Sequence, residues 1–248
     1  MKEVLVIGYG RFGELLCEIL KKDFKISIYE KSRVKSNKAK LKKLNVISSL
    51  DDLNKFNYIF ICVPISIFKD IVLEIKDKTS KNQIIFDVCS VKSYPAKIMS
   101  TYLKNAQIVA THPLFGPDSF GKHLELKIVI CRLKIRDQDY LDLLKYLKKM
   151  KLSVIETTPL KHDHDIIYSQ AFTYIILNLI QNMSFPKIDI STPSYLKLKE
   201  ITDISINDSK QLFNDMLKYN PYFKEFYKKL KLGYKVSLKS LKTISKSK

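Results

Sequence analysis

The stretch EVLVIGYGRFG, residues 3–13, decides the fold of this 248-residue chain. Its β-branched first half predicts a buried strand, and the amphipathic run Arg11–Lys22 that follows predicts a helix. Gly8, Gly10 and Gly13 have the G-x-G-x-x-G spacing between the two. The first glycine permits a tight turn, the second lets the backbone approach a pyrophosphate, and the third allows close helix packing. We therefore predict a dinucleotide site at the helix N-terminus.

Glycine usage and the next acidic residue support this interpretation. The chain has 6 glycines, three of them in this turn, whereas average usage of about 7% would give roughly 17. Glu30 ends the following strand twenty residues after Gly10, where a carboxylate can bind a ribose hydroxyl. A carboxylate repels a 2′-phosphate, so we expect NAD. NADP stays open because Lys31 and Arg33 follow directly.

Strand-like and helix-like segments alternate through the first two thirds of the chain, which predicts an α/β fold with a doubly wound, Rossmann-type parallel sheet. We assign residues 1–158 to this dinucleotide-binding domain. The expected strands, continuous in Val, Ile and Phe as in sheets covered on both faces, are Glu3–Gly8, Lys25–Glu30, Tyr58–Pro64, Gln83–Val88, Gln107–Pro113, Lys127–Arg132 and Ser153–Thr158.

Near Pro159 the strand-like runs stop, and helical spacing continues to residue 248. We assign 159–248 to a smaller all-helical dimerisation and substrate domain. Its last helix repeats apolar residues at three- and four-residue steps: Phe223, Tyr227, Leu230, Tyr234, Leu238 and Leu241. Such a broad apolar face predicts a homodimer formed through the C-terminal helices.

Composition excludes several other classes. The net charge is +19, but only 4 of the 44 basic residues are arginine, the residue that reads bases and phosphates bidentately, so we expect no nucleic-acid partner. The longest apolar stretch, Ile166–Ile180, is too short and polar to span a membrane. No secretory signal is visible, and the four cysteines are far apart without CxxC spacing. We therefore expect a cytoplasmic protein.

Polar residues follow two of the expected strands, at the sheet edge where such folds bind ligands. Ser90 and Lys92 follow one strand, and we expect both to face the ligand cleft, although either serine of SVKS could equally be a helix N-cap. His112 ends the next strand, within THPLFGPDSFG (residues 111–121). Histidine suits proton transfer near neutral pH. Taken alone, however, a histidine that merely caps the strand is the better interpretation.

Together these motifs resemble the prephenate/arogenate dehydrogenases of tyrosine biosynthesis over nearly the whole chain. The resemblance rests on four elements in order: Gly8-x-Gly10-x-x-Gly13, Asp87-x-x-Ser90-Val-Lys92, His112-Pro-Leu-Phe-Gly116-Pro-Asp-Ser119, and His162-Asp163 with Gln170 eight residues after the histidine. It implies NAD(P)-dependent oxidative decarboxylation of a cyclohexadiene ring by an enzyme with an N-terminal dinucleotide-binding domain and a C-terminal helical dimerisation domain.

The resemblance also implies residue roles. His112 would bind the ring hydroxyl and help to remove its proton, Ser90 would orient His112 and the nicotinamide, and Lys92 would supply positive charge. The substrate set is His112, Gly116, Ser119, His162, Asp163 and Gln170. The cofactor set is Gly8, Gly10, Arg11, Phe12, Gly13, Glu30, Val63, Pro64 and Ser90.

Two departures concern the substrate. Tyr174 stands where many relatives have a histidine, and Asp203 stands where many prephenate-using relatives have an arginine that holds a carboxylate. The absence of that arginine favours arogenate, whose amine an acidic residue such as Asp163 or Asp165 would bind. KHDHD, residues 161–165, resembles a metal cluster, but its alternating side chains diverge, so we expect no metal. Two rivals stay open: another Rossmann-fold dehydrogenase or reductase with a helical second domain, and a non-catalytic NAD-binding sensor.

Overall fold

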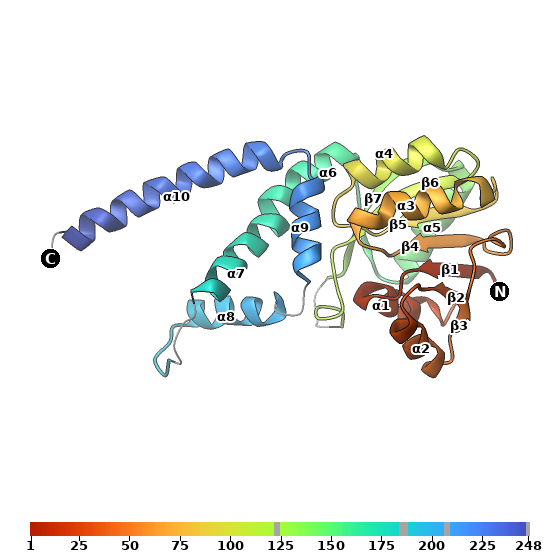
Figure 1. Ribbon diagram of the computed structural model, residues 1–248, viewed down its shortest axis with the longest axis horizontal. Helices are drawn as coiled ribbons and strands as arrows, with labels where there is room; N and C mark the ends of the chain where they lie inside the picture. The colour runs from red at the N-terminus through yellow and green to blue at the C-terminus, as the bar shows by residue number, and fades with distance from the viewer. Residues whose placement is uncertain (122–124, 184–187, 206–208, 247–248) are drawn as a thin grey trace. The chain divides into compact units, whose positions relative to one another are not determined.

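The computed structural model describes residues 1–121, 125–183, 188–205 and 209–246, with the side chains of all of these except 203–205 and 246 (Figure 1). The chain divides into two compact units, Met1–His162 and Asp163–Lys248. The first holds the sheet and the second is helical.

An eight-stranded sheet forms the first unit, in the order β3-β2-β1-β4-β5-β6-β7-β8. The strands are β1 (Glu3–Ile7), β2 (Lys25–Tyr29), β3 (Asn45–Ile47), β4 (Tyr58–Ile61), β5 (Ile84–Asp87), β6 (Gln107–Pro113), β7 (Lys127–Lys134) and β8 (Ser153–Glu156). The first six are parallel in the order of dinucleotide-binding folds. The predicted Rossmann-type architecture is confirmed. The short edge strand β3 is not among the strands that the sequence predicts.

The pairing of β6 with β7 differs from the all-parallel sheet that the sequence predicts. These two strands are antiparallel, with His112 opposite Val129. A parallel return needs a crossover, usually a helix, and the described residues between Pro113 and Lys127 contain none. The chain therefore turns back directly, and the loop that begins at Leu114 stays at the end of the sheet that carries His112.

Helices cover both faces of the sheet (Figure 1). They are α1 (Arg11–Leu20), α2 (Arg33–Leu41), α3 (Ile65–Ile75), the short 3₁₀ turn η1 (Lys76–Lys78), α4 (Ser93–Tyr102) and α5 (Asp137–Lys149). On one face Val4 and Val6 of β1 pack in a cluster with Cys17 of α1. Leu5 and Ile7, which alternate with them, are also buried. Burial on both faces explains the unbroken apolar sequence of this strand.

The second unit continues from α6 (Pro159–Ile166), which crosses the boundary between the units. Its other elements are the π-helical turn η2 (Ile167–Ala171), α7 (Phe172–Asn182), α8 (Pro193–Ser205), α9 (Lys210–Tyr219) and α10 (Phe223–Lys246). Phe226 of α10 is 4% exposed. Its ring lies 5.4 Å from the ring of Tyr168 and 6.2 Å from that of Phe172. This aromatic cluster attaches the start of α10 to η2 and α7.

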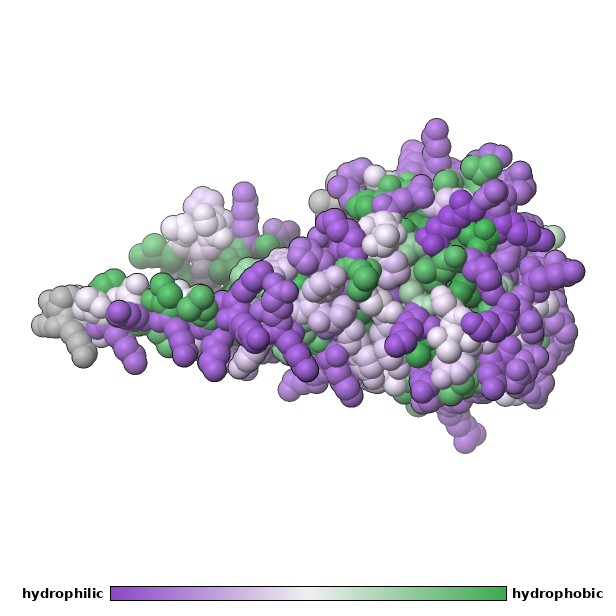
Figure 2. Space-filling view, turned by 90° about the horizontal axis from the view of Figure 1, so that it is seen from above, coloured by the Kyte–Doolittle hydropathy of each residue, from purple (hydrophilic) through white to green (hydrophobic). Residues whose placement is uncertain are grey.

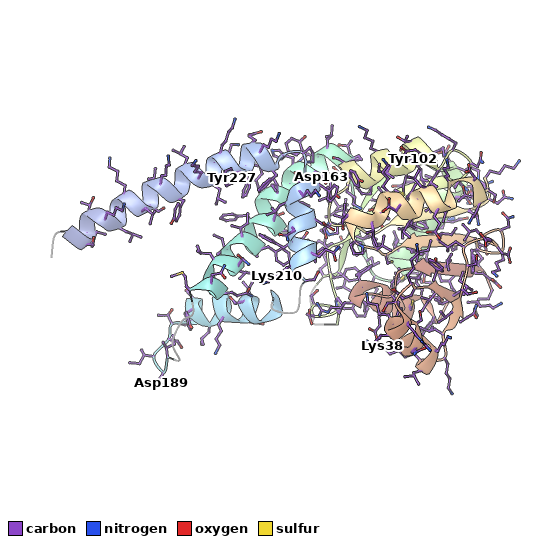
Figure 3. The ribbon with its side chains drawn as sticks, viewed as in Figure 1. Lys38, Tyr102, Asp163, Asp189, Lys210 and Tyr227 are labelled. Carbon is purple, nitrogen blue, oxygen red and sulfur yellow. The ribbon has the colours of Figure 1, made fainter. Side chains whose placement is uncertain are left out.

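Beyond that cluster, α10 leaves large apolar side chains on its surface. Tyr227, Tyr234 and Leu241 are 51%, 58% and 61% exposed, and Figure 2 shows hydrophobic residues spaced along this helix. The stick view labels Tyr227 near the start of the helix (Figure 3). Within the described residues, no helix is both long enough and apolar enough to cross a membrane.

Candidate active site

The glycine-rich turn is built as its spacing predicts. Gly8 has a φ of +100°, and a Cβ there would lie 2.6 Å from the carbonyl oxygen of Cys62. A Cβ on Gly13 would overlap the carbonyl oxygen of Gly8, so α1 can approach this closely only with glycine there. Gly10 is different, because its Cβ position meets nothing within 4 Å. This open position at the start of α1, where no side chain caps the helix, is the space that a pyrophosphate needs.

Glu30 holds the turn in place from the end of β2. One carboxylate oxygen accepts a hydrogen bond from the backbone N–H of Tyr9 at 2.7 Å, and the other accepts one from Ser32 at 2.8 Å. The carboxylate thus lies beside the glycine-rich turn, where a ribose hydroxyl is expected. The neighbouring cation Lys31 forms an exposed ion pair with Glu74 at 3.0 Å.

The turn lies where the strand order reverses, between β1 and β4. Open α/β sheets bind ligands at this switch point. Val63 and Pro64 follow β4, with a Val63 methyl 3.0 Å from the Cβ position of Gly8, and Pro64 begins α3. Both predicted cofactor residues therefore lie at the same edge as the glycines.

His112 lies near the end of β6 and pairs with a second histidine. Its Nδ1 is 2.9 Å from Nε2 of His162 in α6, so one ring donates a hydrogen bond to the other. The two side chains are 4% and 3% exposed. Burial, the His162 ring and the Lys92 charge, in that order, hold the pKa of His112 well below its ordinary value. His112 is therefore neutral near pH 7, as a proton acceptor must be.

Lys92 does not face the cleft, and that expectation is wrong. Lys92 and Asp87 are both 0% exposed, and the ammonium forms an ion pair with the Asp87 carboxylate. It also donates to the carbonyl oxygen of Thr111 at 2.5 Å. A buried charge needs a partner. For Lys92 that partner is Asp87, in the interior of the unit and not in the ligand cleft. Ser90 in the same turn is half-buried, and its role as an orienting residue stays a prediction.

The loop after His112 contacts the start of α1. The hydroxyl of Ser119 accepts a hydrogen bond from the N–H of Gly116 at 2.9 Å, which closes a tight turn. Asp118 forms an ion pair with Arg11 at 2.5 Å, and Phe115 lies 6.5 Å from Phe12, ring to ring. Arg11 and Phe12, predicted as cofactor residues, therefore contact the loop that carries Gly116 and Ser119.

Two further predicted substrate residues belong to the helical unit. Asp163, labelled in Figure 3, lies in α6 and is fully buried, and its carbonyl oxygen accepts a hydrogen bond from Asn220 at 2.8 Å. Gln170 lies in the π-helical turn η2, and its buried side-chain oxygen has no hydrogen-bond partner among the residues that the structure describes. Single π-helical turns are frequent at functional sites. The side chain of Asp203 lies outside the described residues.

Sequence reasoning assigned no role to Asp87 or Thr111, although Asp87 lies within a motif of the resemblance. The signal for Asp87 was available: an acidic residue at the end of a buried strand, five residues before a lysine in the same apolar segment. For metals, the described residues contain no group of three or more His, Cys, Asp or Glu side chains able to hold an ion.

Comparison with known proteins agrees with this geometry. Residues 17–154 match the family described as prephenate dehydrogenase, nucleotide-binding domain. The match covers more than half of the chain. This chain belongs to the prephenate dehydrogenase family.

Relatives of this prephenate dehydrogenase family member include two chloroplastic proteins of Arabidopsis thaliana. Arogenate dehydrogenase 1 is 27% identical over 96% of this chain and 38% of its own length. Arogenate dehydrogenase 2 is 25% identical over 96% of this chain and 70% of its own length. The chain thus spans well under half of the first relative.

A solved structure of the family shares the fold. The prephenate dehydrogenase of Aquifex aeolicus, in complex with hydroxyphenyl propionate and NAD⁺, has a TM-score of 0.71 and 21% identity. The similarity covers 98% of this chain and 90% of that chain. Both units of this family member therefore have a counterpart in a known fold.

Proposed function

We propose that this protein catalyses the NAD(P)-dependent oxidative decarboxylation of arogenate to tyrosine, or of prephenate to 4-hydroxyphenylpyruvate. The observation that carries the proposal is a buried, neutral histidine near the end of β6. It lies at the carboxyl edge of the parallel strands, the edge at which the dinucleotide turn also lies. His112 is bonded through Nδ1 to His162. A dehydrogenase that oxidises a carbon bearing a hydroxyl needs such a group to accept the hydroxyl proton.

The proposed chemistry divides between the chain and the dinucleotide. A bound nicotinamide would supply the hydride acceptor for the ring carbon that carries the hydroxyl. Nε2 of His112 accepts the hydroxyl proton in the tautomer in which its Nδ1–H donates to Nε2 of His162. The ring carboxylate leaves as carbon dioxide, and the electron pair it leaves behind makes the ring aromatic as a phenolate, to which His112 returns the proton. The protein therefore positions and polarises the substrate.

The glycine-rich turn supports a dinucleotide, and Glu30 supports NAD over NADP. The open space at Gly10 fits the approach of a pyrophosphate. The Glu30 carboxylate beside that turn would accept a hydrogen bond from a ribose 2′-hydroxyl and repel a 2′-phosphate.

Purified protein incubated with arogenate or prephenate, each with NAD or NADP, tests the proposal. Reduction of the nicotinamide, followed by its absorbance, is the expected result with at least one pair. NAD binding without turnover in any of the four would instead support a non-catalytic sensor. Turnover only with an unrelated hydroxy acid or imine would support another Rossmann-fold dehydrogenase or reductase.

We further propose arogenate as the preferred substrate, with Asp163 or Asp165 binding its amine. Asp165 is accessible, with 54% of its side chain exposed beside His164, whereas Asp163 is buried. A charged hydrogen bond contributes about 1.5–3 kcal/mol. We therefore expect Asp163→Asn or Asp165→Asn to lower the ratio of kcat/KM for arogenate over prephenate about tenfold or more. Unchanged ratios in both variants would contradict this assignment.

A homodimer formed through the C-terminal helices is also part of the proposal. The exposed side chains of Tyr227, Tyr234 and Leu241 recur every seven residues on α10, which suits helix–helix contact. We expect Tyr234→Glu combined with Leu241→Glu to give a monomer in analytical ultracentrifugation. Lys235→Glu with Lys242→Glu, one residue along at the same spacing, is the matched control and should leave a dimer. A monomeric unmodified protein would refute the proposal.

We also place the protein in the cytoplasm. All four cysteines are free thiols, and three are buried: Cys17, Cys89 and Cys131. This usage suits a reducing compartment. The remaining expected partner is the small-molecule substrate itself.

A further inference from the structure

Asp87 and Lys92 lie where β6 extends past the end of the neighbouring strand β5. In the register of the sheet, β5 ends with Asp87 opposite Ala110. β6 continues for three more residues, with Thr111 opposite Ile130 and His112 opposite Val129 on its other side, in β7. Beyond Ala110 one edge of β6 therefore has no strand to supply ladder hydrogen bonds. Unpaired backbone groups at a buried position carry a free-energy cost.

The ion pair supplies hydrogen bonds to the backbone N–H and carbonyl oxygen of Thr111, and the Thr111 hydroxyl adds a bond to the Asp87 backbone. The N–H of Thr111 donates to Oδ2 of Asp87 at 3.3 Å, and the Thr111 hydroxyl donates to the Asp87 carbonyl oxygen at 2.5 Å. Lys92 donates to the Thr111 carbonyl oxygen at 2.5 Å. That oxygen belongs to the peptide bond that joins Thr111 to His112. Asp87 in turn accepts the N–H of Cys89 at 3.0 Å, so the turn carrying Ser90 is attached to the same carboxylate.

We propose that Asp87 and Lys92 are positioning residues for His112: their ion pair takes the place of a strand at the open edge of β6 and fixes the peptide that carries the proton acceptor. The proposal rests on the proposed function for its kinetic readout. A residue misplaced by about 1 Å can slow a reaction about 100-fold. Both side chains of the pair are 0% exposed, and their hydrogen bonds to Thr111 restrain the position of the next residue, His112.

The pair also affects the charge state of His112. The groups that act on this imidazole are His162 from α6 and Lys92 from the turn after β5. The Lys92 charge lowers the pKa of His112. Removing Lys92 should therefore raise that pKa, which a purely structural role would not do.

The test uses the double variant Asp87→Asn with Lys92→Met. It removes both charges together, because removing one partner alone leaves an uncompensated buried charge and risks unfolding. We expect a folded protein with unchanged NAD affinity and a kcat lower by about 100-fold. We also expect a higher pKa of His112 by NMR titration of the imidazole. The ion pair of Lys78 and Asp51, which are 33% and 78% exposed, gives the matched control. Asp51→Asn with Lys78→Met should change neither kcat nor the pKa of His112.

Thr111→Val is the second variant, in case the first does not fold. It removes only the hydroxyl that donates to Asp87, and we expect kcat to fall about tenfold, which corresponds to about 1.4 kcal/mol. Folded variants with the kcat and His112 titration of the unmodified protein would overturn the proposal. If the unmodified protein turns over neither substrate, the proposed function fails, and the NMR titration still tests the positioning.

Discussion

His112→Asn should lower kcat by about 10²–10⁴-fold, while the Kd for NAD stays unchanged. Asparagine keeps a polar side chain of similar reach but cannot accept a proton at neutral pH. The loss therefore falls on the proton-transfer step and leaves the glycine-rich turn intact. Steady-state kinetics with whichever of arogenate and prephenate the protein turns over, together with NAD titration, measures the two quantities.

The control for this prediction is His164→Asn. His164 lies two residues after His162, and 51% of its side chain is exposed beside Asp165. We expect its replacement to leave kcat within a few-fold. Equal losses in both variants, or a His112→Asn protein that retains full turnover, would show that His112 is not the proton acceptor.

The pH dependence of the unmodified protein follows from the same residue. Burial, His162 and Lys92 lower the pKa of His112 below its ordinary value of 6.5. The imidazole therefore stays neutral at pH 7, and kcat should fall only at acid pH, below 6.5. The unfolded chain binds a proton more readily here than the folded one, so the stability that neutral His112 allows is lost as the pH falls below 6.5.

The second large effect is expected at the glycine-rich turn. Gly13→Ala places a Cβ against the carbonyl oxygen of Gly8, a backbone atom that cannot rotate away. We expect a loss of about 2–3 kcal/mol in the free energy of unfolding, and a Tm lower by roughly 5–10 °C. Thermal unfolding followed by circular dichroism measures both, and NAD affinity should fall with the displaced turn.

Gly10→Ala tests the effect of this turn on NAD affinity separately from its effect on the packing of α1. Its φ is −76° and its Cβ position is open, so alanine fits the free protein and the Tm should not change. The methyl group would stand where the pyrophosphate approaches, and we expect NAD affinity to fall about tenfold or more. A Tm loss in Gly10→Ala equal to that of Gly13→Ala, or full NAD affinity, would contradict this division of roles.

Much of the first unit could be predicted because its signals are local. The strand at Glu3–Ile7 and the helix from Arg11 follow from unbroken apolar residues and amphipathic spacing. The glycines of the turn are needed for steric reasons that act within a few residues. The strand β3 was missed because Asn45–Ile47 is three residues long, too short for any periodic signal.

Other features could not be predicted because they depend on contacts between distant segments. The antiparallel pairing of β7 depends on how the chain returns after Pro113. The inward orientation of Lys92 depends on Asp87 and on the Thr111 carbonyl, which is 19 residues away. A sequence places Lys92 after a strand, but it does not show which side of the turn offers a carboxylate.

The sequence by itself determined the sheet, the dinucleotide turn and the identity of the histidine, because glycine sterics and apolar periodicity are properties of short segments. Only the tertiary structure decided what surrounds that histidine. His162 lies 50 residues from His112, yet the two rings share a hydrogen bond. Burial and neighbouring charge set a pKa, and both arise only when the folded chain brings α6, the end of β5 and the end of β6 together.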